Sequence, residues 1–119
     1  YEFSNKYNYQ FTLSNISTYT INNNFNININ YKYFGNKKQL YYGSNDMLFE
    51  NIINNYSIID LSLNKKFINK QIEISLGGKN LMNNISVISI NNNSVHSGNS
   101  STMNIGYGRT FFIGLNYEL

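Results

Sequence analysis

The end of this chain alternates apolar and polar residues up to its last position. Over residues 108–119 the apolar residues at every second position are Phe111, Ile113, Leu115, Tyr117 and Leu119. Between them lie Thr110, Phe112, Gly114, Asn116 and Glu118. A period of two is the repeat of a β-strand, whose successive side chains point to opposite faces. The pattern predicts a strand with one apolar face, about long enough to cross a bilayer obliquely.

Four earlier segments show the same period. They cover residues 9–21, 25–33, 59–67 and 72–81, and the second of them alternates strictly between apolar residues and Asn or Lys. A helix would scatter these two sets around its circumference, so we predict strands. The sequence therefore indicates an all-β fold, an antiparallel meander of about five strands.

The connections between these strands alternate in length. Asn22–Asn24 and residues 68–70 are short, and Asn tolerates the left-handed conformation of tight turns. Residues 34–55 and 82–106 are long; we expect the first to be a loop or a frayed hairpin extension and the second to be a polar loop. Outer-membrane barrels have short periplasmic turns, long extracellular loops and antiparallel neighbours. The order of connections therefore favours part of a transmembrane β-barrel.

Five strands are too few to close a barrel, because the smallest single-chain barrels have about eight. An open edge in hydrocarbon would leave backbone groups unpaired, at a cost of several kcal/mol each. We therefore expect further strands from the same polypeptide or from separate chains. The sequence starts at Tyr1 without an initiator Met or a signal peptide, so we expect residues 1–119 to be the carboxy-terminal segment of a longer barrel protein.

Composition excludes several classes of protein. Only 13% of the residues are charged, the net charge is +3, and the lysines are scattered, which argues against a nucleic-acid surface. The chain has no Cys, and therefore no disulfide or thiolate metal site. About a fifth of the residues are Asn, but 16% are aromatic and apolar residues alternate in several places, so we expect a folded chain.

A soluble β-sandwich also has alternating strands, and it is the alternative fold. Two features favour the barrel. The polar positions carry mostly Asn, Ser, Thr, Lys and Glu, which suit a wet lumen. Tyr31, Tyr33, Tyr56 and Tyr107 are near the predicted outer ends of strands, where interfacial tyrosines lie, although ordinary hairpin packing would also place tyrosines there.

Three segments carry a resemblance to a known family. They are residues 56–64 (Tyr-Ser-Ile-Ile-Asp-Leu-Ser-Leu-Asn), residues 72–81 with Lys79-Asn80-Leu81, and the terminal segment with Gly108-Arg109-Thr110. Together they resemble the carboxy-terminal barrel strands of TonB-dependent outer-membrane receptors. The resemblance spans Tyr56–Leu119, whereas the first half matches only in its alternation. Leu119 departs from the terminal aromatic residue that is typical of outer-membrane proteins.

The resemblance implies a function. In that family a barrel of twenty-two strands encloses a plug domain and imports scarce nutrients such as a siderophore, cobalamin, haem or an oligosaccharide. An amino-terminal box contacts the TonB complex of the inner membrane. Neither plug nor box is recognisable here, so the implied partners are outer-membrane lipid, the remaining strands and plug of the same receptor, and TonB through an absent amino-terminal part. The implied location is the outer membrane of a Gram-negative bacterium.

Enzymatic chemistry has little support in the sequence. Asp60 and Glu73 lie on predicted polar faces as possible acid/base partners, but charges paired with Lys66 are the simpler interpretation. Gly77-Gly78 is too short to cradle a phosphate and predicts a bulge or a close approach of plug backbone. Arg109 could pin a loop or plug through a carboxylate. We predict no enzyme, no catalytic residue, no metal and no cofactor.

Ligand contacts, if this segment makes any, are expected from the extracellular loops. The candidates are Tyr41, Tyr42, Asp46 and His96, and His96 has no Cys or acidic neighbour that would suggest a metal site. The alternative function is a soluble β-sandwich binding module, an adhesin or carbohydrate-binding domain, with Tyr41 and Tyr42 as its stacking surface.

Overall fold

The computed structural model describes residues 9–42, 48–67, 69–91 and 100–118. These residues are largely strand and contain no helix, and the sheets are antiparallel, as the alternation predicts. The strands are β1 (Thr12–Asn22), β2 (Phe25–Phe34), β3 (Lys37–Tyr42), β4 (Leu48–Ile53), β5 (Tyr56–Phe67), β6 (Ile72–Lys79), β7 (Ser86–Asn91), β8 (Ser100–Asn104) and β9 (Thr110–Tyr117). They form two compact units, one around each of two sheets.

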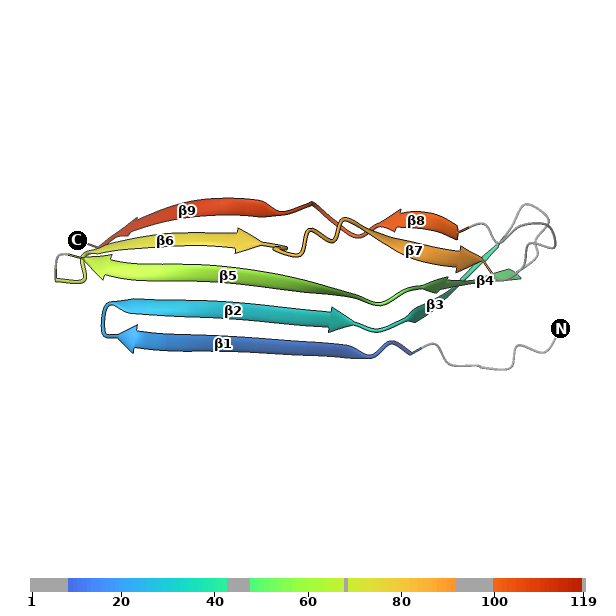
Figure 1. The fold of residues 1–119 in the computed structure, drawn as a ribbon, viewed down its shortest axis with the longest axis horizontal. Helices are drawn as coiled ribbons and strands as arrows, with labels where there is room; N and C mark the ends of the chain where they lie inside the picture. Colours follow the sequence, from blue (N-terminus) through green and yellow to red (C-terminus); the bar gives the residue numbers. More distant parts are fainter. Residues whose placement is uncertain (1–8, 43–47, 68, 92–99, 119) are drawn as a thin grey trace. The chain divides into compact units, whose positions relative to one another are not determined.

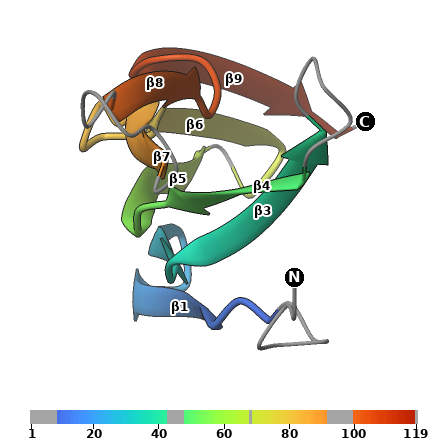
Figure 2. The same ribbon diagram turned by 90° about the vertical axis from the view of Figure 1, so that its right-hand side faces the viewer.

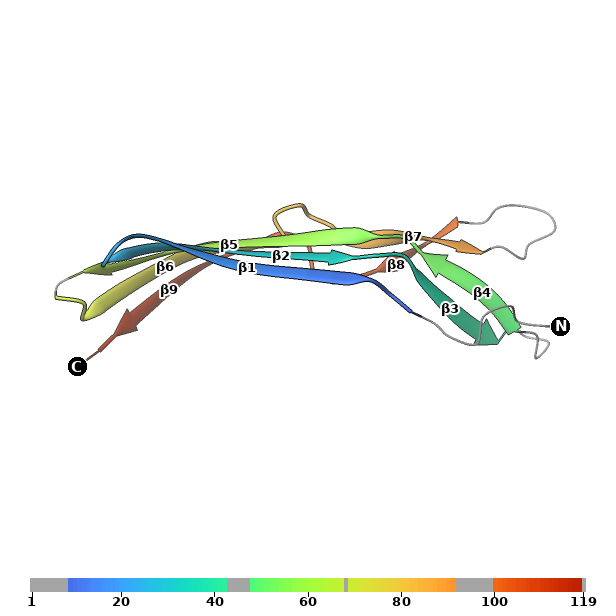
Figure 3. The same ribbon diagram turned by 90° about the horizontal axis from the view of Figure 1, so that it is seen from below.

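The larger sheet has five strands in the order β1-β2-β5-β6-β9, which lie side by side in Figure 1. These are the five strands that the period of two predicts, in the predicted order of neighbours. Among the described residues β1 and β9 are the edge strands of this sheet, and Figure 3 shows its strands as one layer. The fold is therefore an antiparallel meander, interrupted by two excursions into the smaller sheet.

Registers on both sides of β6 run without a break. Leu61 pairs with Gly78 and Phe67 with Ile72 between β5 and β6, and Ile72 pairs in turn with Tyr117 of β9. The predicted bulge at Gly77-Gly78 is therefore wrong: both glycines are regular members of the two ladders.

Asn and Lys residues form the two tight turns. Asn69 and Lys70 in the turn between β5 and β6 both have positive φ, 51° and 73°, as the two central residues of a type I′ turn do. Between β1 and β2 the backbone N–H of Asn24 donates to Oδ1 of Asn22 over 2.9 Å. This side-chain acceptor replaces a backbone acceptor in the turn.

The smaller sheet has the order β3-β4-β7-β8, and Figure 2 shows β3 beside β4. Its strands lie inside the two long connections, residues 34–55 and 82–106, where the sequence predicts a loop or a frayed hairpin extension and a polar loop, respectively. The hairpin extension at 34–55 is confirmed by β3 and β4, whereas the polar loop at 82–106 is wrong over β7 and β8. The reason is physical: Ile52-Ile53 and Val87-Ile88 place apolar side chains on both faces of their strands, so no period of two appears.

The hydrophobic core of the described residues lies in this smaller sheet. Its buried hydrophobic members are Ile53 of β4 and Val87 of β7, and Ser89 beside them is only 2% exposed. Lys38 and Glu50 form an ion pair of 3.2 Å across β3 and β4. In the same unit the rings of Phe34 and Tyr56 stack with centroids 4.7 Å apart. The larger sheet contributes no hydrophobic side chain to the buried set.

Candidate functional site

The five-stranded sheet has a polar face built mainly from amides and hydroxyls. Thr18 donates its Oγ1–H to Oδ1 of Asn28 over 2.8 Å, and Asn28 donates its Nδ2–H to Oγ of Ser62 over 3.3 Å. These contacts run across β1, β2 and β5. Because side chains alternate along a strand, residues two apart from these share the face. The face is thus a ladder of side-chain hydrogen bonds perpendicular to the strands.

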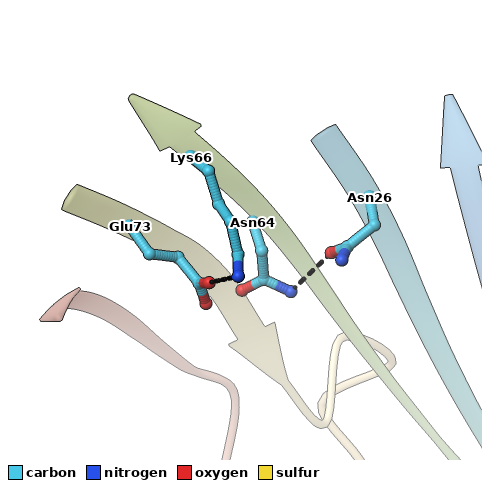
Figure 4. A network of polar contacts seen from close by, with 4 residues as sticks. All are labelled: Asn26, Asn64, Lys66 and Glu73. Atoms are coloured by element: carbon cyan, nitrogen blue, oxygen red, sulfur yellow. Dashed lines mark hydrogen bonds and ion pairs between the residues drawn. The ribbon is translucent and has the colours of Figure 1, made fainter. Parts of the chain in front are cut away.

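A second part of this face carries charge (Figure 4). Nζ of Lys66 in β5 lies 3.4 Å from Oε2 of Glu73, its direct register partner in β6. Beside this pair Asn64 donates to Oδ1 of Asn26 over 2.9 Å. The interpretation of Glu73 as a Lys-paired charge is confirmed.

The structure does not bring Asp60 and Glu73 together. Asp60 precedes Leu61, which pairs with Gly78, so the two carboxylates lie at different levels of the β5–β6 hairpin. Oδ1 of Asp60 accepts the backbone N–H of Asn80 over 2.8 Å. Among the residues that the structure describes, no group of three His, Cys, Asp or Glu side chains could hold a metal ion.

The opposite face of the same sheet is apolar and largely uncovered. Across β5, β6 and β9, Leu63 pairs with Leu76 and Leu76 with Ile113. The exposed large side chains of this face include Tyr19 (61%), Ile21 (60%), Leu76 (46%), Phe111 (75%), Ile113 (79%), Leu115 (74%) and Tyr117 (58%). An apolar surface of this extent marks a binding or membrane surface in a folded protein.

The apolar face contains a shallow hollow of about 340 Å³. Leucines of β5 and β6 and the residues Phe111 and Ile113 of β9 line it. Its walls have almost no polar surface. A ligand that enters it would therefore make van der Waals contacts and few hydrogen bonds.

Two glycines of β6 make room for aromatic rings of β9. Gly77 pairs with Phe112 and Gly78 with Phe111, so the rings lie over opposite faces of the same β6 segment. A Cβ built on Gly77 would lie 2.6 Å from Cε1 of Phe112 and 2.7 Å from the backbone oxygen of Leu61. The close approach at Gly77 is made by the ring of Phe112 and the backbone of β5. An approach of plug backbone to these glycines stays a prediction.

Asn80 joins the ends of three strands. It is 8% exposed and has a positive φ of 50°. Its Nδ2 donates to the backbone oxygens of Asn84 and Tyr107, each over 3.0 Å, and its Oδ1 accepts the N–H of Asn84 over 3.1 Å. Asn84 in turn donates to the backbone oxygen of Ser57 over 2.6 Å. The junction therefore fixes the loop after β6 against the start of β5 and the residues that precede β9.

The two motifs that carry the family resemblance meet at this junction. Asn80 of Lys79-Asn80-Leu81 bonds Tyr107, and the N–H of Arg109 in Gly108-Arg109-Thr110 donates to Oδ1 of Asn83 over 3.0 Å. In the described residues no carboxylate forms an ion pair with the Arg109 side chain. The sequence shows the motif that contains Asn80 but does not mark Asn80 itself as a structural residue.

The structure describes the backbone of two of the four predicted ligand-binding residues, and the grouping of the four stays a prediction. Tyr41 and Tyr42 are the last residues of β3, opposite Phe49 and Leu48 of β4 in the register. Asp46 and His96 lie outside the described residues. Of the predicted interfacial tyrosines, Tyr107 is 92% exposed, while Tyr33 contacts the ring of Phe11 at 6.3 Å.

Comparisons with models of protein families, with curated proteins and with solved structures find no match to this chain. In the part of the chain that the structure describes, no helix is long and apolar enough to cross a membrane.

Proposed function

We propose that this chain is the carboxy-terminal portion of a transmembrane barrel in a TonB-dependent outer-membrane receptor. The observation that carries the proposal is the uncovered apolar face of the five-stranded sheet, with Ile113 and Leu115 of β9 79% and 74% exposed. Burial of such side chains is the main favourable term in folding in water. In the proposal, lipid acyl chains cover this face.

The polar face supports the same function. Its amides, hydroxyls and the Lys66–Glu73 pair bond to one another across the strands, as suits a lumen that holds water or a plug. Along every strand of a barrel wall, side chains that face the interior alternate with side chains that face the exterior, and the polar and apolar faces of this sheet alternate in the same way. The sheet is open at β1 and β9, so the proposal requires further strands that pair with these edges.

The proposed activity is import of a scarce nutrient through the completed barrel, with energy from the TonB complex. The nutrient is a siderophore, cobalamin, haem or an oligosaccharide. The motifs Lys79-Asn80-Leu81 and Gly108-Arg109-Thr110 support the family assignment because they lie side by side: Lys79 pairs with Thr110 in the register, and each motif bonds a residue close to the other.

A pair of adjacent labels on β9 tests the membrane assignment. Leu115→Cys and Asn116→Cys place one thiol on each face, and the 119 residues contain no other Cys. The complete barrel polypeptide, with any further cysteine replaced by Ser, is labelled with a bimane fluorophore and folded into vesicles whose lipids carry brominated acyl chains. We expect bromine to quench the label at position 115 and to leave position 116 bright.

Equal fluorescence at the two positions would contradict the proposal. So would a labelled protein that stays monomeric in buffer without detergent, which is the behaviour of the alternative β-sandwich module. The adjacent positions share one strand and one neighbourhood, so a difference between them reports the face and not the region of the chain.

A further inference from the structure

One charged side chain lies on the apolar face within the strands of the five-stranded sheet. It belongs to Lys65 of β5, which pairs with Ile74 of β6, and Ile74 pairs with Leu115 of β9. Leu63 precedes it and Phe67 follows it on the same face. An ammonium group among apolar side chains needs an explanation, because charge is costly on a lipid-facing surface away from the headgroups.

The Lys65 side chain runs toward the nearby turn. Its Nζ lies 4.8 Å from the ring centroid of Phe67, the last residue of β5. A Lys on an apolar surface keeps its stem on that surface and directs its charge to the nearest polar boundary. If the apolar face is in a membrane, as proposed above, this direction is consistent with a polar boundary at the β5–β6 turn.

Two aromatic residues lie at the end of the sheet next to the β5–β6 turn, toward which the Lys65 side chain runs. Phe67 pairs with Ile72, and Ile72 pairs with Tyr117, so Phe67 and Tyr117 occupy one row across three strands. They are 37% and 58% exposed. Aromatic side chains in such rows sit at the headgroup level on both sides of membrane barrels.

The turn adds a second cation near the boundary. Lys70 is exposed in the turn, and neither Lys65 nor Lys70 forms an ion pair among the described residues. Lys66 faces the other side and is paired with Glu73. Glu118 also lies near the turn, because its backbone N–H donates to the backbone oxygen of Gln71 over 2.9 Å.

We propose that Lys65 and Lys70 bind the headgroup phosphate of an anionic phospholipid at this end of the apolar face. The inference rests on the proposed membrane function and deepens it by naming a lipid site. The ammonium groups donate N–H bonds to phosphate oxygens, Phe67 and Tyr117 contact the glycerol level, and Leu63 and Ile74 contact the acyl chains. Anionic lipid is favoured because the two cations lack carboxylate partners.

Two neighbouring lysines on opposite faces provide the test. The complete barrel polypeptide is purified in mild detergent, and bound phosphatidylglycerol and phosphatidylcholine are quantified by native mass spectrometry. We expect wild type to prefer phosphatidylglycerol, Lys65→Gln to weaken its binding by about fivefold, and Lys70→Gln to have a similar effect. Lys65→Arg should retain binding, and the control Lys66→Gln should leave it unchanged.

Equal binding of the two lipids, or equal losses in Lys65→Gln and Lys66→Gln, would overturn the lipid site. The face-selective quenching at positions 115 and 116 is measured on the same preparations. If quenching is selective while Lys65→Gln binds phosphatidylglycerol like wild type, the lipid site fails and the membrane assignment stands. If quenching is absent at both positions, the membrane assignment itself fails.

Discussion

The side chains on the two faces of the five-stranded sheet differ in the contacts that they make. On the polar face, side chains of neighbouring strands bond to each other, as Asn64 does with Asn26 and Lys66 with Glu73. On the apolar face, Ile113 and Leu115 remain more than 70% exposed. Water can cover the first face at little cost, whereas exposure of the second face to water is costly, and the described residues leave that face largely uncovered.

The smaller sheet gives a useful contrast. Its strands β4 and β7 bury Ile53 and Val87 to 6% and 5% exposure, so this part of the chain forms a small core of its own. The five-stranded sheet has longer strands, and no hydrophobic side chain of its described residues is buried. Among the described residues, the smaller sheet is therefore the one that shields hydrophobic side chains from water within the chain itself.

The largest expected effect comes from charge on the apolar face. Ile113 lies in the middle of β9, in a row with Leu63 and Leu76. We expect Ile113→Lys to destabilise the vesicle-folded protein, lowering its free energy of unfolding by about 2–4 kcal/mol, because a cation far from the headgroups loses its hydration. Denaturant titration of the vesicle-folded protein measures the change.

Asn116→Lys is the matched control for Ile113→Lys. It places the same charge on the polar face of the same strand, so its effect should remain within about 0.5 kcal/mol. Equal effects of the two substitutions would remove the distinction between the faces on which the membrane assignment depends.

A smaller effect is expected where β9 packs on β6. Gly77→Ala adds a Cβ that would lie 2.7 Å from the backbone oxygen of Leu61, and a backbone atom in a paired strand cannot move away easily. We expect a loss of about 1–3 kcal/mol in folding free energy in the same titration.

Gly114→Ala supplies the control for the packing prediction. A Cβ at Gly114 would meet Cβ of Ser75 at 3.4 Å, an ordinary contact, so stability should change little. If Gly114→Ala were as destabilising as Gly77→Ala, the loss would reflect the replacement of a strand glycine in general and not the close approach of the Leu61 oxygen to position 77.

The strands with one apolar face could be predicted from the sequence because their alternation reports the face directly. Strand β2 is the clearest case, since Asn26, Asn28 and Asn30 alternate with apolar residues. The strands of the smaller sheet could not be predicted in this way. In β4 the adjacent residues Ile52 and Ile53 are both apolar, and a two-sided strand has no period of two.

The Asn80 junction was hidden for a different reason. Asn makes up about a fifth of the chain, so a single Asn carries no signal by its type. What distinguishes Asn80 is its positive φ and its bonds to Tyr107 and Asn84, which depend on residues up to 27 positions away. Long-range hydrogen bonds of this kind follow from the register of β6 and β9 and are not written in local sequence.

The smallest expected effect tests how wet the polar face is. The side chains of Lys66 and Glu73 are 39% and 29% exposed in their 3.4 Å pair. In a water-filled lumen such a pair is screened, so a double-mutant cycle with Lys66→Ala and Glu73→Ala should give a coupling energy of about 0.2–1 kcal/mol. The coupling should decrease as salt is raised, because exposed charges are screened by ions. A coupling energy well above 1 kcal/mol that does not respond to salt would mean that another protein surface covers this face and excludes water. Both faces of the sheet would then be covered, and the contrast between a wet face and a lipid-covered face would no longer hold.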